Sequence, residues 1–596
     1  MTECISRRDL IFNLFELHGL EDVLQLPRYT EHDRETCEAL LDAAIKLAHE
    51  KFLTHAAEVD ANEPQFDGEK VHIIPQVKRA LDAYLDGGFL QASFDEEVGG
   101  LQLPQLFASA MSSLFSAANI GTSGYTFLTT AAANLLHAHA GEAQQERYMR
   151  PMLEGRFFGT MCLSEPHAGS SLADVKTRAT PIGDGRYRIA GNKMWISGGD
   201  HELSENIVHM VLAKIEGAPP GVKGISLFIV PKKRVAEDGS VGERNGVSLV
   251  GLNHKMGYRG TTNCALAFGD DGDCIGELVG EPHKGLSYMF HMMNEARIGV
   301  GMGAVALGYA GYTYALDYAK ERPQGRSLTN KDPSAPPVKI IEHPDVRRML
   351  LAQKAYVEGG LALGLHCARL VDEQNGAADE ATRTQATRLL DLLTPIVKSW
   401  PSEYCLEANK LAIQCLGGYG YTREYPVERL YRDNRLNHIH EGTYGIQGLD
   451  LLGRKVIGDQ GRTLAVLAEQ IRDTTRSVPS GLEAYAQELE AAMQRAAEVS
   501  RTLGATAADG KPEVALSNAT IYLDMLGITV VAWLWLRQAL VATQALEAGT
   551  GEADFYQGKL NACRYFFLYE LPRTVPQAEL LSRVDDTLVR LKPEQF

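Results

Sequence analysis

Residues 437–442, with the sequence NHIHEG, place two imidazoles and a carboxylate close together. His438 and His440 are two positions apart, so on a strand they could bind zinc from the same side. No third histidine and no cysteine cluster completes a recognisable set of ligands around Glu441. We therefore expect no metal site here.

A second reactive pattern is Ser164 followed three residues later by His167, which could pair a nucleophile with its base. Pro166 stands between them, and no G-x-S-x-G elbow surrounds the serine. Nothing would expose or activate the hydroxyl, so we do not expect a serine nucleophile.

A third pattern is formed by Gly299, Gly301 and Ala304, which fit the dinucleotide motif G-x-G-x-x-A. That motif needs a strand and a tight turn before it. Residues 288–298 instead follow a helical pattern that continues into the glycines. We expect these glycines to allow close packing of helices.

Hydrophobic periodicity around these motifs divides the chain into four parts. Apolar residues recur at spacings of three and four over residues 37–153, whereas residues 157–278 alternate in short β-branched runs separated by Gly, Pro and Asp turns. Long helical patterns return after residue 285 and suit a four-helix bundle. We predict a mainly α fold with a central β domain. Its parts are an N-terminal helical domain over 1–157, a barrel-like β domain over 158–284, a four-helix bundle over 285–459 and an additional helical domain over 460–596. Within the last domain we expect helices over 462–476, 482–502, 514–547 and 554–569.

Composition limits the partners. The chain of 596 residues carries 59 Lys and Arg against 76 Asp and Glu, a formal charge of −17, which argues against nucleic acid as a partner. The nine cysteines are dispersed without a C-x-x-C pair, which favours a reducing compartment. No signal peptide is recognisable, and the longest apolar stretch, residues 525–536, is shorter than a membrane span. We expect a cytoplasmic protein in which residues 525–536 form a buried helix, and the sequence leaves membrane association of the last domain open.

Seven strings give the sequence a family resemblance. In order, they are MCLSEPHAGSS from residue 161, GNKMWISGG from 191, KMGYRGTT from 255, NEARIG from 294, ERPQGR from 321, IQCLGGYGYTREYPVERLYRD from 413 and IHEGTYGIQ from 439. Together they resemble the acyl-CoA dehydrogenase family over roughly residues 40–455. The extra helical domain resembles the larger bacterial branch, which includes methylmercaptopropionyl-CoA and fatty acyl-CoA dehydrogenases.

The resemblance implies α,β-dehydrogenation of an acyl-CoA thioester. A base removes the α-proton while hydride leaves Cβ for flavin N5, and since no side chain accepts hydride, FAD is the implied cofactor. Glu441 stands at the family's position for the base, where desolvation raises a carboxylate pKa toward the working pH. Gly442 would bring its backbone N–H to the thioester oxygen. One branch of the family takes its base from the residue before the arginine of NEAR, but that residue here is Ala296, and Glu295 is about 100° round the helix.

The implied flavin contacts of the β domain match three motif positions. Ser164 stands where the family meets the pyrimidine edge of the ring, Trp195 where an indole packs on the flavin, and Ser197 where a hydroxyl bonds N5. Ser170 resembles the serine near the flavin phosphate or the CoA pantetheine, although Ser171 replaces the usual Asp. Trp195 could alternatively fill a core.

Further implied contacts lie in the bundle. Arg322 matches the arginine on the FAD pyrophosphate, a role suited to a planar cation with several donors. Gln414, Gly417 and Gly418 match a segment that reaches the adenosine half of FAD in a neighbouring subunit, which implies a homodimer. Thr443 matches a threonine near the adenine, whereas Gly445 replaces the usual Gln.

On the substrate side, Asn294 takes a position often held by Asp, and Arg297 matches the arginine that braces the active-site helix or serves as a structural ion-pair partner. The resemblance implies electron-transferring flavoprotein as the electron acceptor, and we expect medium- or long-chain fatty acyl-CoA as the substrate. Three alternatives stay open: a methylmercaptopropionyl-CoA dehydrogenase, an acyl-CoA oxidase that reduces oxygen directly, and a non-catalytic acyl-CoA-binding homologue.

Overall fold

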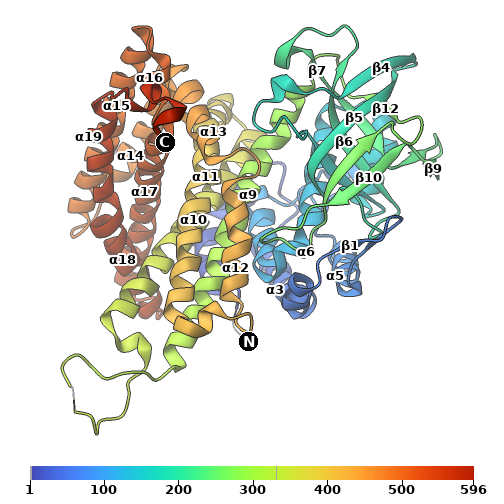
Figure 1. The fold of residues 1–596 in the computed structure, drawn as a ribbon. Coiled ribbons are helices and arrows are strands. Elements are labelled where there is room, and N and C mark those ends of the chain that lie inside the picture. The colour runs from blue at the N-terminus through green and yellow to red at the C-terminus, as the bar shows by residue number, and fades with distance from the viewer. Residues whose placement is uncertain (1–2, 331) are drawn as a thin grey trace. The chain divides into compact units, whose positions relative to one another are not determined.

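The computed structural model describes residues 3–330 and 332–596, apart from the side chains of residues 291–294. The chain forms two compact units. The sheet unit comprises Glu38–Leu103 and Leu114–Gly299, and the helical unit comprises Met1–Cys37, Pro104–Ser113 and Val300–Phe596. Figure 1 shows the strands gathered in the sheet unit and the late helices, α14 to α19, beside α10 and α11 in the helical unit.

The sheet unit contains a closed β-barrel. The ring runs β5, β12, β7, β6, β4 and back to β5, with β11 and β10 added beyond β5 and β3 added parallel to β6. Closure removes exposed strand edges from this part of the sheet. The strands are β1 (Gln65–Phe66), β2 (Val71–His72), β3 (Phe157–Cys162), β4 (Arg178–Gly183), β5 (Arg186–Ser197), β6 (Asn206–Ile215), β7 (Ile225–Pro231), β8 (Lys233–Val235), β9 (Val241–Arg244), β10 (Val247–Leu252), β11 (Asn263–Phe268) and β12 (Ile275–Leu278).

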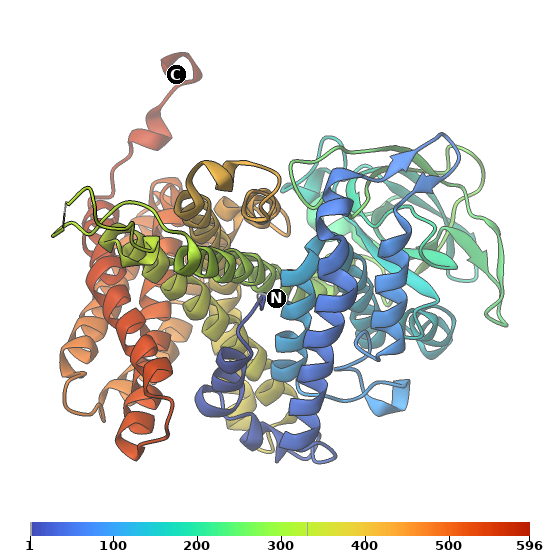
Figure 2. The same cartoon turned by 90° about the horizontal axis from the view of Figure 1, so that it is seen from below.

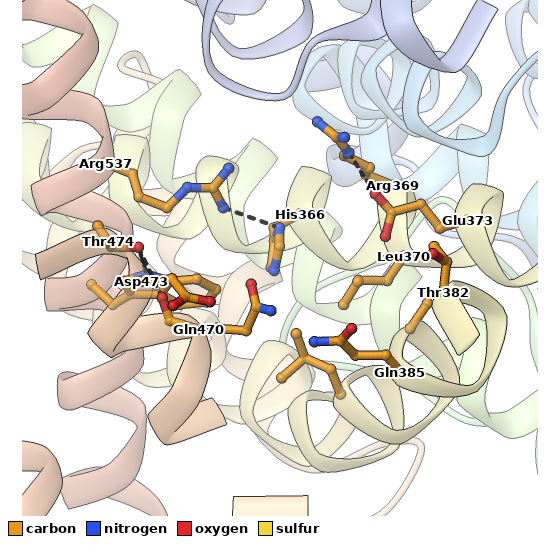
Figure 3. Close-up of a pocket in the computed structure, with 13 residues that line it drawn as sticks. His366, Arg369, Leu370, Glu373, Thr382, Gln385, Gln470, Asp473, Thr474 and Arg537 are labelled. Atoms are coloured by element: carbon orange, nitrogen blue, oxygen red, sulfur yellow. Dashed lines mark hydrogen bonds and ion pairs between the residues drawn. The ribbon is translucent and has the colours of Figure 1, made fainter. Parts of the chain in front are cut away.

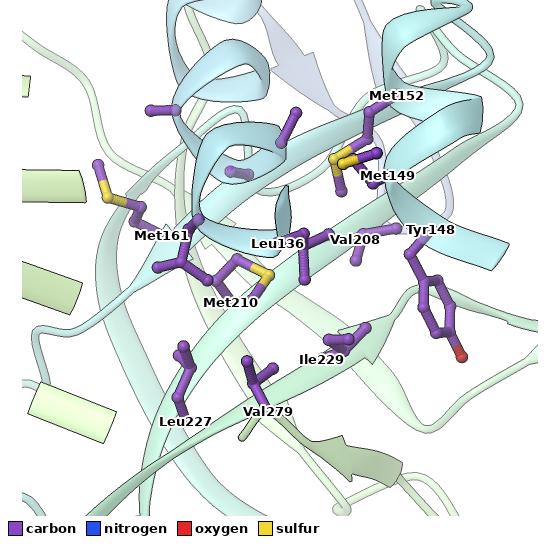
Figure 4. Close-up of a cluster of buried hydrophobic side chains, with 14 of the residues drawn as sticks. Leu136, Tyr148, Met149, Met152, Met161, Val208, Met210, Leu227, Ile229 and Val279 are labelled. Carbon is purple, nitrogen blue, oxygen red and sulfur yellow. The ribbon is translucent and has the colours of Figure 1, made fainter. Parts of the chain in front are cut away.

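The barrel packs against helices within the same unit. Apolar side chains of β6 and β7 meet those of α6 and α8 in one buried cluster, which includes Leu136, Met152, Met210 and Ile229 (Figure 4). The helices of this part of the chain are α3 (Arg34–Leu47), α4 (Ala56–Ala61), α5 (Pro75–Asp86), α6 (Gln105–His139), α7 (Glu142–Gln144) and α8 (Arg150–Leu153).

Long helices build the helical unit. They are α9 (Gly285–Glu321), whose first turns belong to the sheet unit, α10 (Pro344–Gly376) and α11 (Glu380–Leu416), preceded by α1 (Arg7–Ile11) and α2 (Leu20–Leu24) and followed by α12 (Val427–Asn434) and α13 (Tyr444–Leu449). A Cβ added to Gly301 would lie 1.9 Å from the carbonyl oxygen of Val397, so α9 and α11 touch through their backbones. The glycines at 299 and 301 therefore lie inside a helix and serve close packing, as expected.

The last part of the chain is also helical. It comprises α14 (Arg462–Thr475), α15 (Glu483–Ala508), α16 (Pro512–Leu516), α17 (Ala519–Ala548), α18 (Ala553–Tyr565), α19 (Thr574–Ser582) and α20 (Thr587–Arg590), after which the chain leads away from the other helices (Figure 2). Buried Lys559 of α18 bonds Glu358 at 2.8 Å and also pairs with Asp9, so this part, the bundle and the N-terminal segment share one interior.

Helix α17 contains the apolar stretch singled out in the sequence. It is long and apolar enough to cross a membrane, with a mean hydropathy of 1.6, but 83% of that window is buried inside the structure. Residues 525–536 are all buried, which confirms the expected core helix.

The predicted mainly α fold with a central β domain is confirmed, and one predicted helix has the wrong bounds. The helix predicted over residues 514–547 is broken, because Asn518 adopts non-helical φ and ψ of −113° and 31° and separates α16 from α17. Within the helical pattern of residues 37–153, β1 and β2 form a hairpin, since Asp67 and Gly68 make a tight turn in which Gly68 has a φ of +100°.

Candidate active site

Trp195 projects from an irregularity in the barrel. Cys264 pairs with Ile196 and Leu266 with Lys193, so β5 has two residues, 194 and 195, opposite the single residue 265 of β11. Such a bulge bends a strand and redirects a side chain. Trp195 has a φ of +65°, which is rare for a bulky residue, and its side chain is 63% exposed. The alternative in which this indole fills the core is therefore wrong.

A buried ion pair joins the loop after β3 to this bulge. Lys193 Nζ lies 3.0 Å from Glu165 Oε1, and both side chains are almost fully buried. Glu165 also accepts hydrogen bonds from the backbone N–H groups of Lys176 and Thr177 and from the Thr177 hydroxyl. Although burial raises the pKa of Glu165, Lys193 and these donors outweigh it, and the pKa lies below its usual range.

Two candidate serines flank this pair. The Ser164 carbonyl accepts a hydrogen bond of 3.0 Å from Met194 N, and the Ser197 hydroxyl accepts one of 3.3 Å from Asn263 Nδ2. Ser164 and Ser197 are partly exposed, as is the Trp195 ring between them in the chain. An exposed aromatic plane, with two partly exposed serine hydroxyls on the same strand and on the loop bonded to it, fits a planar ring with polar edges, so these residues fit a flavin.

The Ser170 side chain is exposed on the loop that follows β3. Its neighbour Ser171, which departs from the family pattern, donates a hydrogen bond of 2.7 Å to Asp174 Oδ2. A carboxylate is therefore still present in this loop, three residues later in the chain.

Glu441 lies in a strained turn of the helical unit. Glu441 has a φ of +53°, and Gly442 follows with +91°. The carbonyl oxygens of both residues accept hydrogen bonds from inside the unit. Gln447 Nε2 donates to the Glu441 carbonyl at 3.0 Å, and Lys398 Nζ donates to the Gly442 carbonyl at 2.8 Å. Gln447 and Lys398 are fully buried. A left-handed glutamate costs of the order of 1–3 kcal/mol and persists only where surrounding contacts impose it.

The two histidines before Glu441 are poor bases. Burial and, after it, the positive charge of Lys398 lower the pKa of His440 to about 3. Burial, and after it the positive charges of Arg435 and Lys398, lower the pKa of His438 to about 4. Both imidazoles are neutral near pH 7 and too weakly basic to hold a proton taken from a substrate.

The remaining candidates of the helical unit lie on its surface. Arg322 is exposed, and its guanidinium carbon lies 5.7 Å from the centroid of the Tyr419 ring. Gly417 has a φ of +62° and a ψ of −136°, a conformation nearly restricted to glycine. Gln414, Gly418 and Thr443 are exposed as well, and Thr443 precedes the first residue of α13.

The first turns of α9 carry the substrate-side candidates. Arg297 is buried, with 3% of its surface exposed, whereas the side chain of Asn294 lies outside the described residues. Ala296 is also buried. Glu295 accepts a hydrogen bond of 2.9 Å from Asn134 Nδ2 on α6.

Four residues that position the candidates were missed in the sequence. Lys193 and Glu165 connect two of the strings that carry the resemblance, and their opposite charges within those strings were an available signal. Gln447 ends the string from residue 439 that also contains Glu441, so its place in that string was an available signal. Lys398 lies in an ordinary helical pattern, 44 residues before the carbonyl that it binds. No local pattern reports such a contact.

Comparison with known proteins covers nearly the whole chain. Four family models match: "Acyl-CoA dehydrogenase, N-terminal domain" over residues 34–156, "middle domain" over 160–270, "C-terminal domain" over 283–456 and "Acetyl-CoA dehydrogenase C-terminal like" over 467–592. The 3-methylmercaptopropionyl-CoA dehydrogenase of Ruegeria pomeroyi is 35% identical, and the broad-specificity linear acyl-CoA dehydrogenase FadE5 of Mycobacterium tuberculosis is 36% identical, each over 99% of both chains.

A solved structure shows the same fold. The acyl-CoA dehydrogenase of Bacillus anthracis, which was crystallised with FAD, superposes with a TM-score of 0.72 over 96% of this chain and 94% of its own, at 21% identity. The long relatives share the helical domain after residue 460 as well as the first three domains. The chain belongs to the acyl-CoA dehydrogenase family.

Proposed function

We propose that this enzyme dehydrogenates a linear medium- or long-chain acyl-CoA to the trans-2-enoyl-CoA, with Glu441 as the base. The observation that carries the proposal is the strained turn at Glu441, fixed by Lys398 and Gln447. FAD, when bound, supplies the acceptor for the hydride that leaves Cβ.

Glu441 would take the α-proton onto a carboxylate oxygen. Its competitors are disqualified by charge and position: His438 and His440 are too weakly basic, and the NEAR position before the arginine holds Ala296. The Gly442 N–H, next to the base, would stabilise the negative charge that develops on the thioester oxygen when the α-proton leaves.

The other candidates would hold the cofactor and the substrate. Trp195, Ser164 and Ser197 would contact the isoalloxazine, and Arg322 the pyrophosphate. Ser170 would bind near the flavin phosphate or the pantetheine, and Arg297 and Asn294 would support the substrate side.

The exposed segment from Gln414 to Gly418 supports a homodimer in which it reaches the adenosine half of the partner's FAD, with Thr443 near the adenine. It is followed by Tyr419 and Tyr421, which are 49% and 87% exposed and unusually apolar for a free surface. A dimer would cover them. Electron-transferring flavoprotein is the proposed acceptor of the electrons, and the cytoplasm is the proposed location.

The central test replaces Glu441 by Gln in the FAD-loaded enzyme. General base catalysis contributes about 10²–10⁴-fold, so we expect turnover on the best acyl-CoA to fall by that factor. Absorbance of the oxidised flavin checks that FAD is retained. Glu407→Gln is the matched control, because Glu407 is a partly exposed glutamate that pairs with Lys410 on α11. Wild-type turnover of E441Q with FAD bound would refute the assignment.

Substrate and acceptor are tested in the same assay. Butyryl-, octanoyl-, palmitoyl- and 3-methylmercaptopropionyl-CoA are compared with electron-transferring flavoprotein or oxygen as the acceptor. We expect the highest kcat/KM for octanoyl- or palmitoyl-CoA and little peroxide. A preference for the thioether substrate, or peroxide formed at the rate of substrate loss, would contradict this choice in favour of the corresponding alternative.

A further inference from the structure

A cavity of about 410 Å³ opens within the helical unit, among α10, α11, α14 and α17. Figure 3 shows its lining, in which α10 and α11 of the bundle face α14 and α17 of the last domain. One wall is apolar and includes Leu370, Leu389 and Trp533, all less than 5% exposed. The cavity is near the lower end of the range for ligand pockets, which suits a small molecule and not a whole CoA thioester.

Arg537 brings a positive charge to this cavity. Among the described residues, its guanidinium donates hydrogen bonds of 3.4 Å to His366 Nδ1 and of 3.4 Å to the Leu17 carbonyl, and its central carbon lies 5.4 Å from the centroid of the Trp533 ring. Within residues 3–330 and 332–596, no carboxylate forms an ion pair with it. Burial, and then the like charge of Arg369, lower the pKa of Arg537 to about 10 against the opposing effect of Glu373, so the guanidinium stays protonated near pH 7.

The two carboxylates that line the cavity are already paired. Glu373 lies 2.9 Å from Arg369 Nε, and Asp473 lies 2.9 Å from the exposed Arg476. Within each of these two pairs, the positive and the negative charge cancel. Arg537 is therefore the lining cation that no carboxylate of the described residues pairs with, which leaves its guanidinium available to an anion.

His366 adds a second donor. Its Nδ1 receives the Arg537 contact, and burial lowers its pKa well below the usual value, so the neutral ring carries its proton on Nε2. His366 is 7% exposed, and its Nε2 has no hydrogen-bond partner among the described residues. Figure 3 shows this nitrogen facing the space bounded by Gln470 and Gln385. A buried donor without an acceptor costs about 1–3 kcal/mol, which a bound acceptor would recover.

We propose that this cavity binds a monocarboxylate with an aliphatic tail, whose carboxylate accepts from Arg537 and from His366 Nε2 while the tail lies along Leu370, Leu389 and Trp533. A carboxylate presents two acceptor oxygens and a negative charge to these two donors, one of which is a cation without an ion-pair partner among the described residues. The site lies apart from the Glu441 turn and does not depend on the function proposed above.

The test is calorimetric titration of the full-length, FAD-loaded enzyme with octanoate. We expect one equivalent to bind per chain, and saturation with a non-reacting acyl-CoA analogue to leave this binding unchanged. Arg537→Gln should weaken octanoate binding at least tenfold, or about 1.4 kcal/mol, and His366→Phe should weaken it while preserving the ring. Arg472→Gln, an exposed arginine of α14 outside the cavity, should change nothing.

Three results would overturn the proposal. The first is the absence of binding heat at about 10 mM octanoate, a concentration that detects even millimolar affinity. The second is displacement of octanoate by the acyl-CoA analogue. The third is equal octanoate binding by wild type, R537Q and H366F. Inorganic phosphate titrated in parallel should not compete, and competition by phosphate would overturn the assignment to a carboxylate with a tail. Circular dichroism of each variant checks the fold, and H366F carries the test if R537Q is unfolded.

Discussion

Replacing Lys193 by Met tests whether the buried ion pair with Glu165 holds the loop of Ser164 against the bulge of Trp195. The two side chains are 0% and 2% exposed, and removal of one member of such a pair costs about 3–5 kcal/mol. Glu165 keeps three other donors, from Lys176 and Thr177, so we expect the lower end, a loss of about 3 kcal/mol in the free energy of unfolding.

Urea unfolding at pH 7 measures this loss, with Arg188→Gln as the control. Arg188 pairs with Asp273 at 2.9 Å on the surface of the same unit, where both side chains are more than half exposed, and such a pair is worth less than about 1 kcal/mol. If K193M costs no more than R188Q, the buried pair does not stabilise the loop and the reasoning is wrong.

Acid pH gives this prediction a second signature. The pKa of Glu165 in the folded protein lies below its usual value, so the pair stabilises the fold above the unfolded pKa of about 4 and loses that contribution as pH falls through the folded pKa. The difference between wild type and K193M should therefore shrink below pH 4. The FAD dissociation constant should rise in K193M by about tenfold or more, corresponding to 1.4 kcal/mol, because the loop and the bulge lose their connection.

Three further substitutions test other parts of the structure. Burial raises the pKa of Asp372 from 3.8 to about 6, despite the hydrogen bonds that it accepts at the start of α6. The free energy of unfolding should therefore fall by about 3 kcal/mol as the pH rises from 4 to 7. Urea unfolding of Asp372→Asn should lack this fall, and wild-type and variant stabilities that change in parallel with pH would contradict the prediction. Gly301→Ala should lower the free energy of unfolding by about 1–3 kcal/mol, because its Cβ would collide with the backbone of α11. The control Gly504→Ala, on α15 with open space around it, should raise that free energy by about 0.5–1 kcal/mol. Equal effects of the two substitutions would refute the packing argument. Lys398→Met should lower turnover by about 100-fold at unchanged FAD content, since the Gly442 carbonyl loses its charged donor and keeps only the longer bond from Gln447. Unchanged turnover would show that the turn does not need Lys398.

Periodicity predicted the fold well where elements are long. The helices of the bundle and the run at residues 525–536 have apolar patterns that persist over many turns, so single residues hardly alter the prediction. Periodicity missed details where one or two residues decide the structure: Asn518 breaks a predicted helix between α16 and α17, and Asp67 and Gly68 turn the short β1–β2 hairpin inside a mostly helical segment. Their effect depends on local backbone conformation, which an averaged pattern does not resolve.

The candidate site was accessible from motifs, but not all of its supports were. Trp195, Glu441 and Gln447 stand in strings that carry the family resemblance, whereas Lys398 reaches the Glu441 turn through a tertiary contact. A lysine inside an amphipathic helix normally faces solvent. Only the fold shows that Lys398 is fully buried and binds a carbonyl in a distant loop.

Backbone strain at two positions connects these observations. Trp195 and Glu441 both have a positive φ, where glycine would cost less, and each is next to or near a glycine, Gly198 and Gly442, that also has a positive φ. If the chain needed only a turn, glycine would serve at positions 195 and 441 as well. A large aromatic ring and a carboxylate are present instead, at a conformational cost that buried contacts must offset. The strain at these two positions therefore favours, for each residue separately, the role proposed above for its side chain.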